Sequence, residues 1–111
     1  MIEKTLIDYL SAALTVPVYM ERPVDPPGKY VIIQKTGSSK HNQICSAMVA
    51  FQSYAPTLYE AAVLNEVVKV AVEASISLPE IVSAKLNSDY NFTNTAMKQN
   101  RYQAVFNFTH Y

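Results

Sequence analysis

The chain has 111 residues, of which half are hydrophobic, and nine basic side chains balance nine acidic ones. A chain of this length builds one ordinary hydrophobic core, so we expect a single domain over residues 1–111. A formal net charge of zero creates no long-range field that would gather nucleic acid, an anionic membrane or acidic substrates. Cys45 is the only cysteine, which excludes an internal disulfide and a zinc site built from cysteines.

The sequence predicts neither a membrane segment nor a bound cofactor. No apolar run approaches the roughly 20 residues of a membrane-spanning helix, and Glu3 and Asp8 interrupt the segment where a secretion signal needs an apolar run. We therefore expect synthesis in the cytoplasm and no membrane partner. His41 and His110 lack carboxylates or thiols at the spacing of a known metal site, so we expect no metal.

The first half of the chain predicts a helix followed by three strands. Apolar residues at helical spacing form one stripe of a helix that Pro17 ends; they are Ile2, Leu6, Tyr9, Leu10 and Ala13. A short strand follows at residues 18–20, and then a proline-containing loop at 22–29. Strands are predicted at 30–36 and 44–54, with a polar connection at 37–43 between them.

A second, long helix is predicted after Pro56. The Thr57–Glu60 segment has the form of a capping box, and we expect the helix to run to about Ala74. Apolar residues occupy more of its circumference than one sheet face needs. We expect the first helix to cover the surplus by ordinary layer packing, and a contact with another subunit is the alternative.

The last quarter of the chain predicts a hairpin with one aromatic and one polar face. Period-two alternation assigns to the inner face Ala84, Leu86, Ser88, Tyr90 and Phe92, and then Tyr102, Ala104, Phe106 and Phe108. The other face is almost uncharged, and it suits a neighbouring protein as well as water. The element order α-β-β-β-α-β-β predicts an α+β fold, a mostly antiparallel sheet of four to five strands with two helices on one face.

One group of residues suggests a catalytic alternative. Cys45, His41 and Asp89 are the residue types of a nucleophile, a base and an orienting acid, as in a small hydrolase. A ligand-binding domain is the related alternative. However, Cys45 falls on the predicted core face, where a thiol is normally inert, and no nucleophile-elbow or phosphate-loop motif occurs. We therefore expect no catalytic residues and no enzyme.

Basic side chains occur near two predicted loops. Lys40 and His41 lie on one, and Lys98 and Arg101 lie at the end of another. If both loops share an edge of the sheet, these residues form a basic rim. In a ring of copies they would surround a central opening and meet the backbone of DNA that passes through it. The alternative is that they are ordinary solvated loop charges.

Five segments, taken in order, carry a resemblance that runs through nearly all of the chain. They are Tyr19–Pro23, Tyr30–Ser38, Gln52–Ala61, Leu86–Thr93 and Arg101–Phe106. With them the chain resembles the tail terminator or tail completion proteins of long-tailed, non-contractile bacteriophages, including the minor tail and head-tail joining proteins of prophages. None of these segments is a catalytic signature.

The resemblance implies a small α+β protein of the virion, at the junction of tail and neck. Proteins of this family close a ring, typically a hexamer, on the last ring of the tail tube, which stops tube growth and offers a surface to the head connector or stopper protein. DNA would pass through the ring only as cargo. Another neck component, such as a head completion or stopper protein, is the alternative within the virion.

A head-to-tail ring requires two different patches on each copy. For one patch we expect the outward residues of the C-terminal hairpin, which are Asn87, Asp89, Asn91, Asn107 and Thr109. For the other we expect Val68 and Val72 on the second helix, together with the proline loop at Val24–Pro27.

Overall fold

The computed structural model, which describes residues 1–97 and 99–111, confirms the α+β prediction. The elements are α1 (Ile2–Ala13), β1 (Val18–Tyr19), β2 (Tyr30–His41), β3 (Ile44–Ala55), α2 (Leu58–Glu73), a short 3₁₀ turn (Ala74–Ser77), β4 (Ile81–Asn91) and β5 (Asn100–His110). The sheet has the strand order β1-β2-β3-β5-β4. Strand β1 is parallel to β2, and the other pairs are antiparallel.

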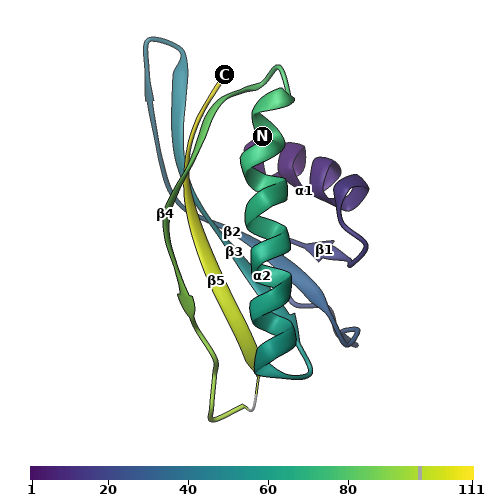
Figure 1. Ribbon diagram of the computed structural model, residues 1–111. Coiled ribbons are helices and arrows are strands. Elements are labelled where there is room, and N and C mark those ends of the chain that lie inside the picture. Colours follow the sequence, from purple (N-terminus) through teal and green to yellow (C-terminus); the bar gives the residue numbers. More distant parts are fainter. Residues whose placement is uncertain (98) are drawn as a thin grey trace.

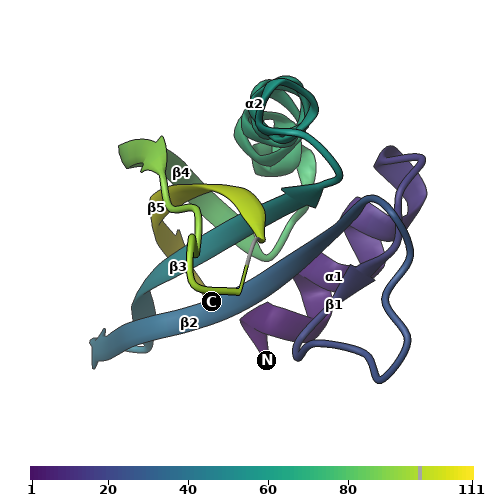
Figure 2. The same ribbon diagram turned by 90° about the horizontal axis from the view of Figure 1, so that it is seen from below.

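Both helices cover one face of the twisted sheet, as Figures 1 and 2 show. Helix α1 buries Ile2, Leu6 and Leu10 against this face. Helix α2 begins where the capping box predicts, because the Thr57 hydroxyl oxygen accepts from the Glu60 amide at 3.1 Å. The Tyr9 hydroxyl donates to the Ala71 carbonyl at 2.8 Å and joins the two helices.

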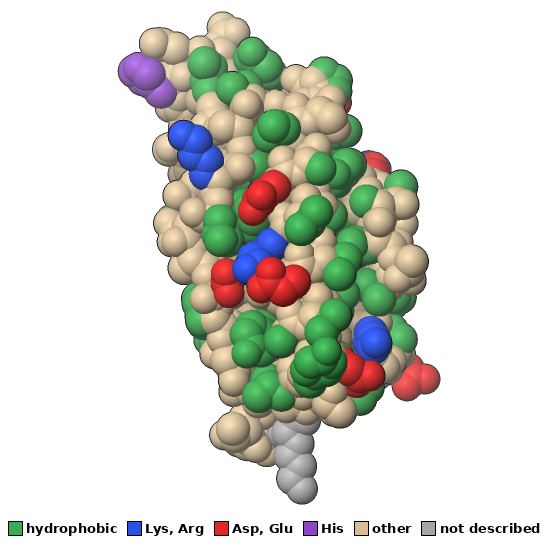
Figure 3. Space-filling model, viewed as in Figure 1, with side chains coloured by type: hydrophobic (Ala, Val, Ile, Leu, Met, Phe, Trp, Pro, Cys, Tyr) green, Lys and Arg blue, Asp and Glu red, His purple; other side chains and the backbone are tan. Residues whose placement is uncertain are grey.

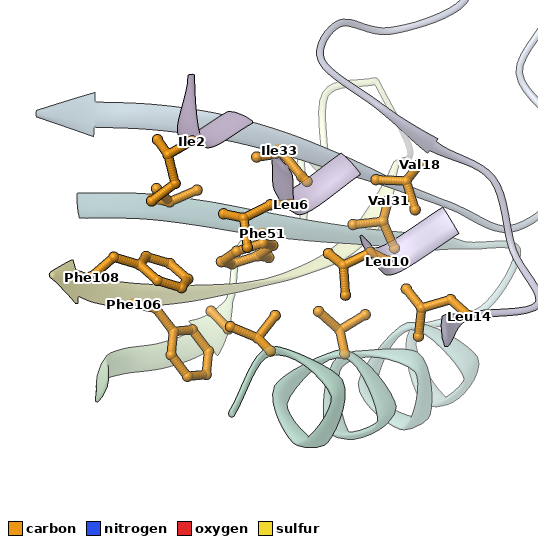
Figure 4. Packing of buried hydrophobic residues seen from close by; sticks show 14 of the residues in the cluster. Ile2, Leu6, Leu10, Leu14, Val18, Val31, Ile33, Phe51, Phe106 and Phe108 are labelled. Carbon is orange, nitrogen blue, oxygen red and sulfur yellow. The ribbon is translucent and has the colours of Figure 1, made fainter. Parts of the chain in front are cut away.

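The main core lies between the helices and the sheet (Figure 4). Phe51, Phe106 and Phe108 are almost completely buried there, and the Phe51 and Phe106 rings meet edge to face with centroids 5.8 Å apart. Helix α2 contributes Val68 and Val72, which have no exposed surface. Burial of side chains of this size supplies most of the stabilisation of the fold.

The predicted connection at 37–43 is wrong, because both strands continue through it. Strand β2 runs to His41 and β3 starts at Ile44, so the turn consists of Asn42 and Gln43, with φ of 50° and 66°. Both residues adopt the left-handed conformation that two-residue hairpin turns require. The polar composition misled the prediction, since residues 41–44 extend past the end of β5 and the side chains on both faces of residues 36–44 are exposed (Figure 1). We call residues 36–46 the arm.

The predicted inner face of the C-terminal hairpin is correct for β5 and wrong for half of β4. Ala104, Phe106 and Phe108 are buried as expected. In β4, however, the register shifts between Leu86 and Ser88. A bulge inserts one extra residue and reverses the alternation beyond it. Asp89 therefore faces the helices, opposite Ala104, whereas Ser88 and Tyr90 lie on the other side of the sheet, which we call the open face.

Candidate interaction surfaces

One end of the open face is closed by an aromatic cluster that the sequence analysis missed. Tyr30 and Tyr54 are buried on neighbouring strands, with their rings stacked at a centroid distance of 4.5 Å. Tyr19 meets Tyr30 edge to face. The sequence signal was present, because Tyr30 and Tyr54 alternate with the core residues Val31 and Ser53 along the same strands. This end of the open face is therefore a second, smaller core.

Arg101 ties the β4–β5 connection to this aromatic cluster. Its Nε atom donates to the Phe92 carbonyl at 2.6 Å, its terminal nitrogen donates to the Tyr54 hydroxyl at 2.8 Å, and its guanidinium lies 4.4 Å from the centre of the Phe92 ring. A chain of hydrogen bonds continues from Tyr54 to Gln52, Gln103 and Tyr90. These contacts stabilise the β4–β5 connection and fix the position of the Arg101 side chain.

The aromatic cluster also changes the acidity of one phenol. Burial raises the pKa of Tyr30, because the anion would lose its hydration. The guanidinium of Arg22, on the proline loop, acts in the opposite direction. The proline loop therefore approaches the same end of the open face.

The other end of the open face is hollow and almost uncharged. The hollow has a volume of about 480 Å³ and is lined by Thr36, Gly37, Ser38, Ser39, Ser46, Ala47, Met48, Asn107, Phe108 and Thr109. Asn107 and Thr109 were both expected in an interface, and Asn107 is exposed beside the half-exposed Met48. Small hydroxyl and amide groups dominate this lining.

The other three hairpin residues expected in that patch do not share its surface. Asn87 lies at the β4 bulge. Asp89 faces α2, and Asn91 uses its side-chain oxygen to accept from the amide and hydroxyl of Thr93. The expectation of one continuous hairpin patch is therefore wrong, because the bulge sends Asp89 to the opposite face from Asn107.

Asp89 instead belongs to a charged cluster that joins β4 to α2. The Lys69 ammonium lies 2.9 Å from carboxylate oxygens of both Asp89 and Glu66, and only 15% of the Lys69 side chain is exposed. The hydrogen bond that Lys69 donates to Asp89, followed by the one that it donates to Glu66, raises the pKa of Lys69. The two carboxylates outnumber the ammonium, so the cluster keeps a net negative charge.

The expected interface at Val68 and Val72 is wrong, because both residues are in the core. Tyr59, Val63, Val67 and Val70 are exposed instead, and 70% of Val70 is accessible. These four residues form a stripe that, with Glu66 and Glu73, we call the α2 outer face. Figure 3 shows apolar side chains over α2, with charged groups between them. The first helix therefore covers only part of the apolar surplus of α2.

The proline loop behaves as its composition indicates. Val24 is fully exposed on it. No regular element forms between β1 and β2, as prolines and a turn glycine predict. Val24 therefore remains available for a contact, although it lies on a loop and not beside Val68.

The expected basic rim does not form within one copy. Lys40 and His41 are at the tip of the arm, whereas Arg101 pairs with Tyr54 at the other end of β3. Tyr54 lies nine positions along β3 from Cys45, which is opposite Lys40, and this is about 30 Å of strand. Lys98 lies outside the described residues.

The catalytic alternative fails on the same geometry. His41 pairs with Ile44, so its side chain leaves the sheet on the face opposite to Cys45. Asp89 lies near the middle of β5 and is bound to Lys69. The half-buried Cys45 lies opposite His110 instead, beside a hollow of about 280 Å³ that Met1, Glu3 and Lys35 also line. In the described residues, no three potential metal ligands gather.

No protein-family model matches this chain, and no curated protein matches its sequence. Within residues 1–97 and 99–111, neither helix has the length and apolar character to span a bilayer. An inference about function therefore depends on the surfaces described above.

Proposed function

We propose that this protein caps the end of a bacteriophage tail tube as a ring, stops tail growth and offers the surface to which the head joins. The observation that carries the proposal is the pair of unlike contact surfaces on opposite sides of one small domain. The α2 outer face is apolar with acidic borders. The hollow of the open face is lined by small hydroxyl and amide side chains together with Met48 and Phe108, and none of its lining residues is charged.

Two unlike surfaces are what a ring requires. A head-to-tail contact joins different patches of neighbouring copies, and it closes when the rotation per subunit is right. A ring, which the resemblance suggests is a hexamer, would have its tube partner on one side and its head connector or stopper partner on the other. Capping by binding needs no catalytic group, cofactor or metal.

The charge of the chain also suits a conduit. The formal net charge is zero, and hydrogen bonds hold the Arg101 side chain against Tyr54 and Phe92. A weakly charged ring would let DNA pass without holding it, because each additional phosphate contact strengthens binding. DNA is therefore proposed as cargo and not as a bound ligand.

Electron microscopy of particles assembled without this gene tests the proposal. We expect filled heads beside unattached, overlong tails, since an uncapped tube keeps growing. Tails of normal length without heads would instead indicate another neck component, such as a head completion or stopper protein. Complete, infectious particles would overturn both assignments.

A further inference from the structure

We propose that the arm of one copy binds the α2 outer face of the next copy, as the contact that repeats around the ring. This inference rests on the proposed function, because it assumes that copies of this chain assemble with one another. It identifies the partner surface as a second copy of this chain, and it names which two surfaces meet.

The arm has the structure of a contact element. Residues 36–44 are all exposed, and 43% of Ile44 is accessible near the tip. Beyond Ile33, β2 also has an unpaired edge, because β1 pairs only with Val31 and Ile32. A projecting strand with an unpaired edge and an exposed apolar side chain is a typical site of association between chains. Within the same copy, β5 supports the base of the arm, because Cys45 and Ser46 pair with His110 and Thr109, and Glu3 of α1 lies 3.7 Å from Lys35 just before the arm.

The charges of the two surfaces are opposite. The arm tip carries Lys40 and His41 and no acidic residue. The α2 outer face and its border with β4 carry Glu66, Glu73 and Asp89 against the ammonium of Lys69. Lys29, which lies beside Tyr59 and Val63, is paired with Glu60 at 3.8 Å. The ammonium of Lys40 on the arm and the excess carboxylates beside α2 favour a contact of arm against helix over arm against arm.

Their apolar groups also complement each other. The stripe of Tyr59, Val63, Val67 and Val70 gives a surface on which Ile44 of a neighbour can be buried. Each copy would use its arm on one side and its α2 outer face on the other. The contact is therefore heterologous, so it propagates from copy to copy and closes into a ring when the rotation per subunit is right.

Disulfide cross-linking tests which surfaces meet. The background is Cys45→Ser, which removes the native thiol, and Ile44→Cys and Val70→Cys are added to it. Oxidation is carried out on concentrated protein and on particles assembled with the same variant. We expect a ladder of dimers, trimers and larger species with both new cysteines, and at most dimers with either one alone. A ladder is expected because each heterologous contact links one arm to one helix.

Two results would overturn the inference. One is the absence of a ladder in both preparations. The other is a ladder from the comparison pair Ile44→Cys and Asn107→Cys, which would direct the arm to the open face. The two proposals can also fail separately. If the cross-linked ladder forms but particles assembled without this gene are normal, the arm contact is retained and the capping function is rejected.

A charge exchange tests the electrostatic part separately. We expect Lys40→Glu and Glu73→Lys each to reduce the yield of the ladder at least several-fold, and the two together to restore most of it. Restoration requires that opposite surfaces of two copies meet, since a general loss of folding cannot be repaired in this way. A double variant as poor as the single ones would reject this pairing of charges.

Discussion

Asn65 lies on the buried face of α2 with 1% of its surface exposed, and its Oδ1 atom has no hydrogen-bond partner among the described residues. An unpartnered buried oxygen costs about 1–3 kcal/mol. We predict that Asn65→Leu, which keeps the branched shape of the side chain and has no polar atom, raises the free energy of unfolding by about 1 kcal/mol in urea titrations. The control Val68→Ala, at a neighbouring buried position, should lower it by about 2 kcal/mol. A lower stability of Asn65→Leu would contradict the unpartnered state of this oxygen.

The charge of Lys69 makes the free energy of unfolding depend on pH in the alkaline range. Its carboxylate partners raise its pKa above the ordinary value of 10.5, so the folded state holds the proton more tightly than the unfolded state does. Its contribution to stability is therefore complete below the unfolded pKa and is lost as the pH rises through the folded pKa. We predict that the free energy of unfolding falls more steeply with pH above about 10 in the wild type than in Lys69→Met.

The exposed Lys85 on β4 supplies the matched control for this titration. Lys85→Met should keep the steep alkaline slope of the wild type, because Asp89 and Glu66 still hold Lys69. Chemical denaturation at several pH values measures all three proteins. Equal slopes for Lys69→Met and the wild type would show that the link between α2 and β4 does not depend on the Lys69 charge.

Among the elements, those with a local signal could be predicted from the sequence. The capping box marks the start of α2, and the helical spacing of Ile2, Leu6 and Leu10 marks the buried side of α1. The bulge of β4 has no such signal, because Asn87 differs little from its neighbours and alternation assumes an unbroken register. The arm was missed for a related reason, since a strand exposed on both sides has no apolar face to reveal it.

The cap of α2 gives a prediction at the scale of this element. The Thr57 hydroxyl accepts from the Glu60 amide and donates to the Glu60 carboxylate, both at 3.1 Å. Removing it in Thr57→Ala should lower the free energy of unfolding by about 1 kcal/mol, because an orphan amide at the helix start loses its acceptor. Thr57→Ser keeps the hydroxyl and should retain most of that stability. Thermal or urea unfolding compares the three proteins, and equal losses in both variants would contradict the capping role.

For the whole molecule, the candidate sites depended on distances that the sequence does not contain. His41 and Cys45 are close in sequence, yet strand pairing places them on opposite faces, whereas the distant His110 lies opposite Cys45. Lys40 and Arg101 are separated by most of the length of the sheet for the same reason. The predicted contact surface on α2 was wrong by a smaller margin, because it was placed on the buried side of the correct helix. An apolar excess indicates that surplus surface exists, but only the packing of α1 decides that Val68 is buried and Val70 exposed.

The hollow of the open face gives the last prediction, which concerns the assembled particle. Asn107 is exposed in it, so Asn107→Arg adds bulk and charge without entering the core. We expect the unfolding free energy of this variant to remain within about 0.5 kcal/mol of the wild type. The fraction of tails with normal length and attached heads should nevertheless fall sharply in electron micrographs, because a large cation would be buried against the tube or the head connector.

Ser11→Arg, at an exposed position of α1, is the matched control and should assemble normally. Normal particles from Asn107→Arg would remove the surface around Asn107 from the contacts with the tube and the head connector.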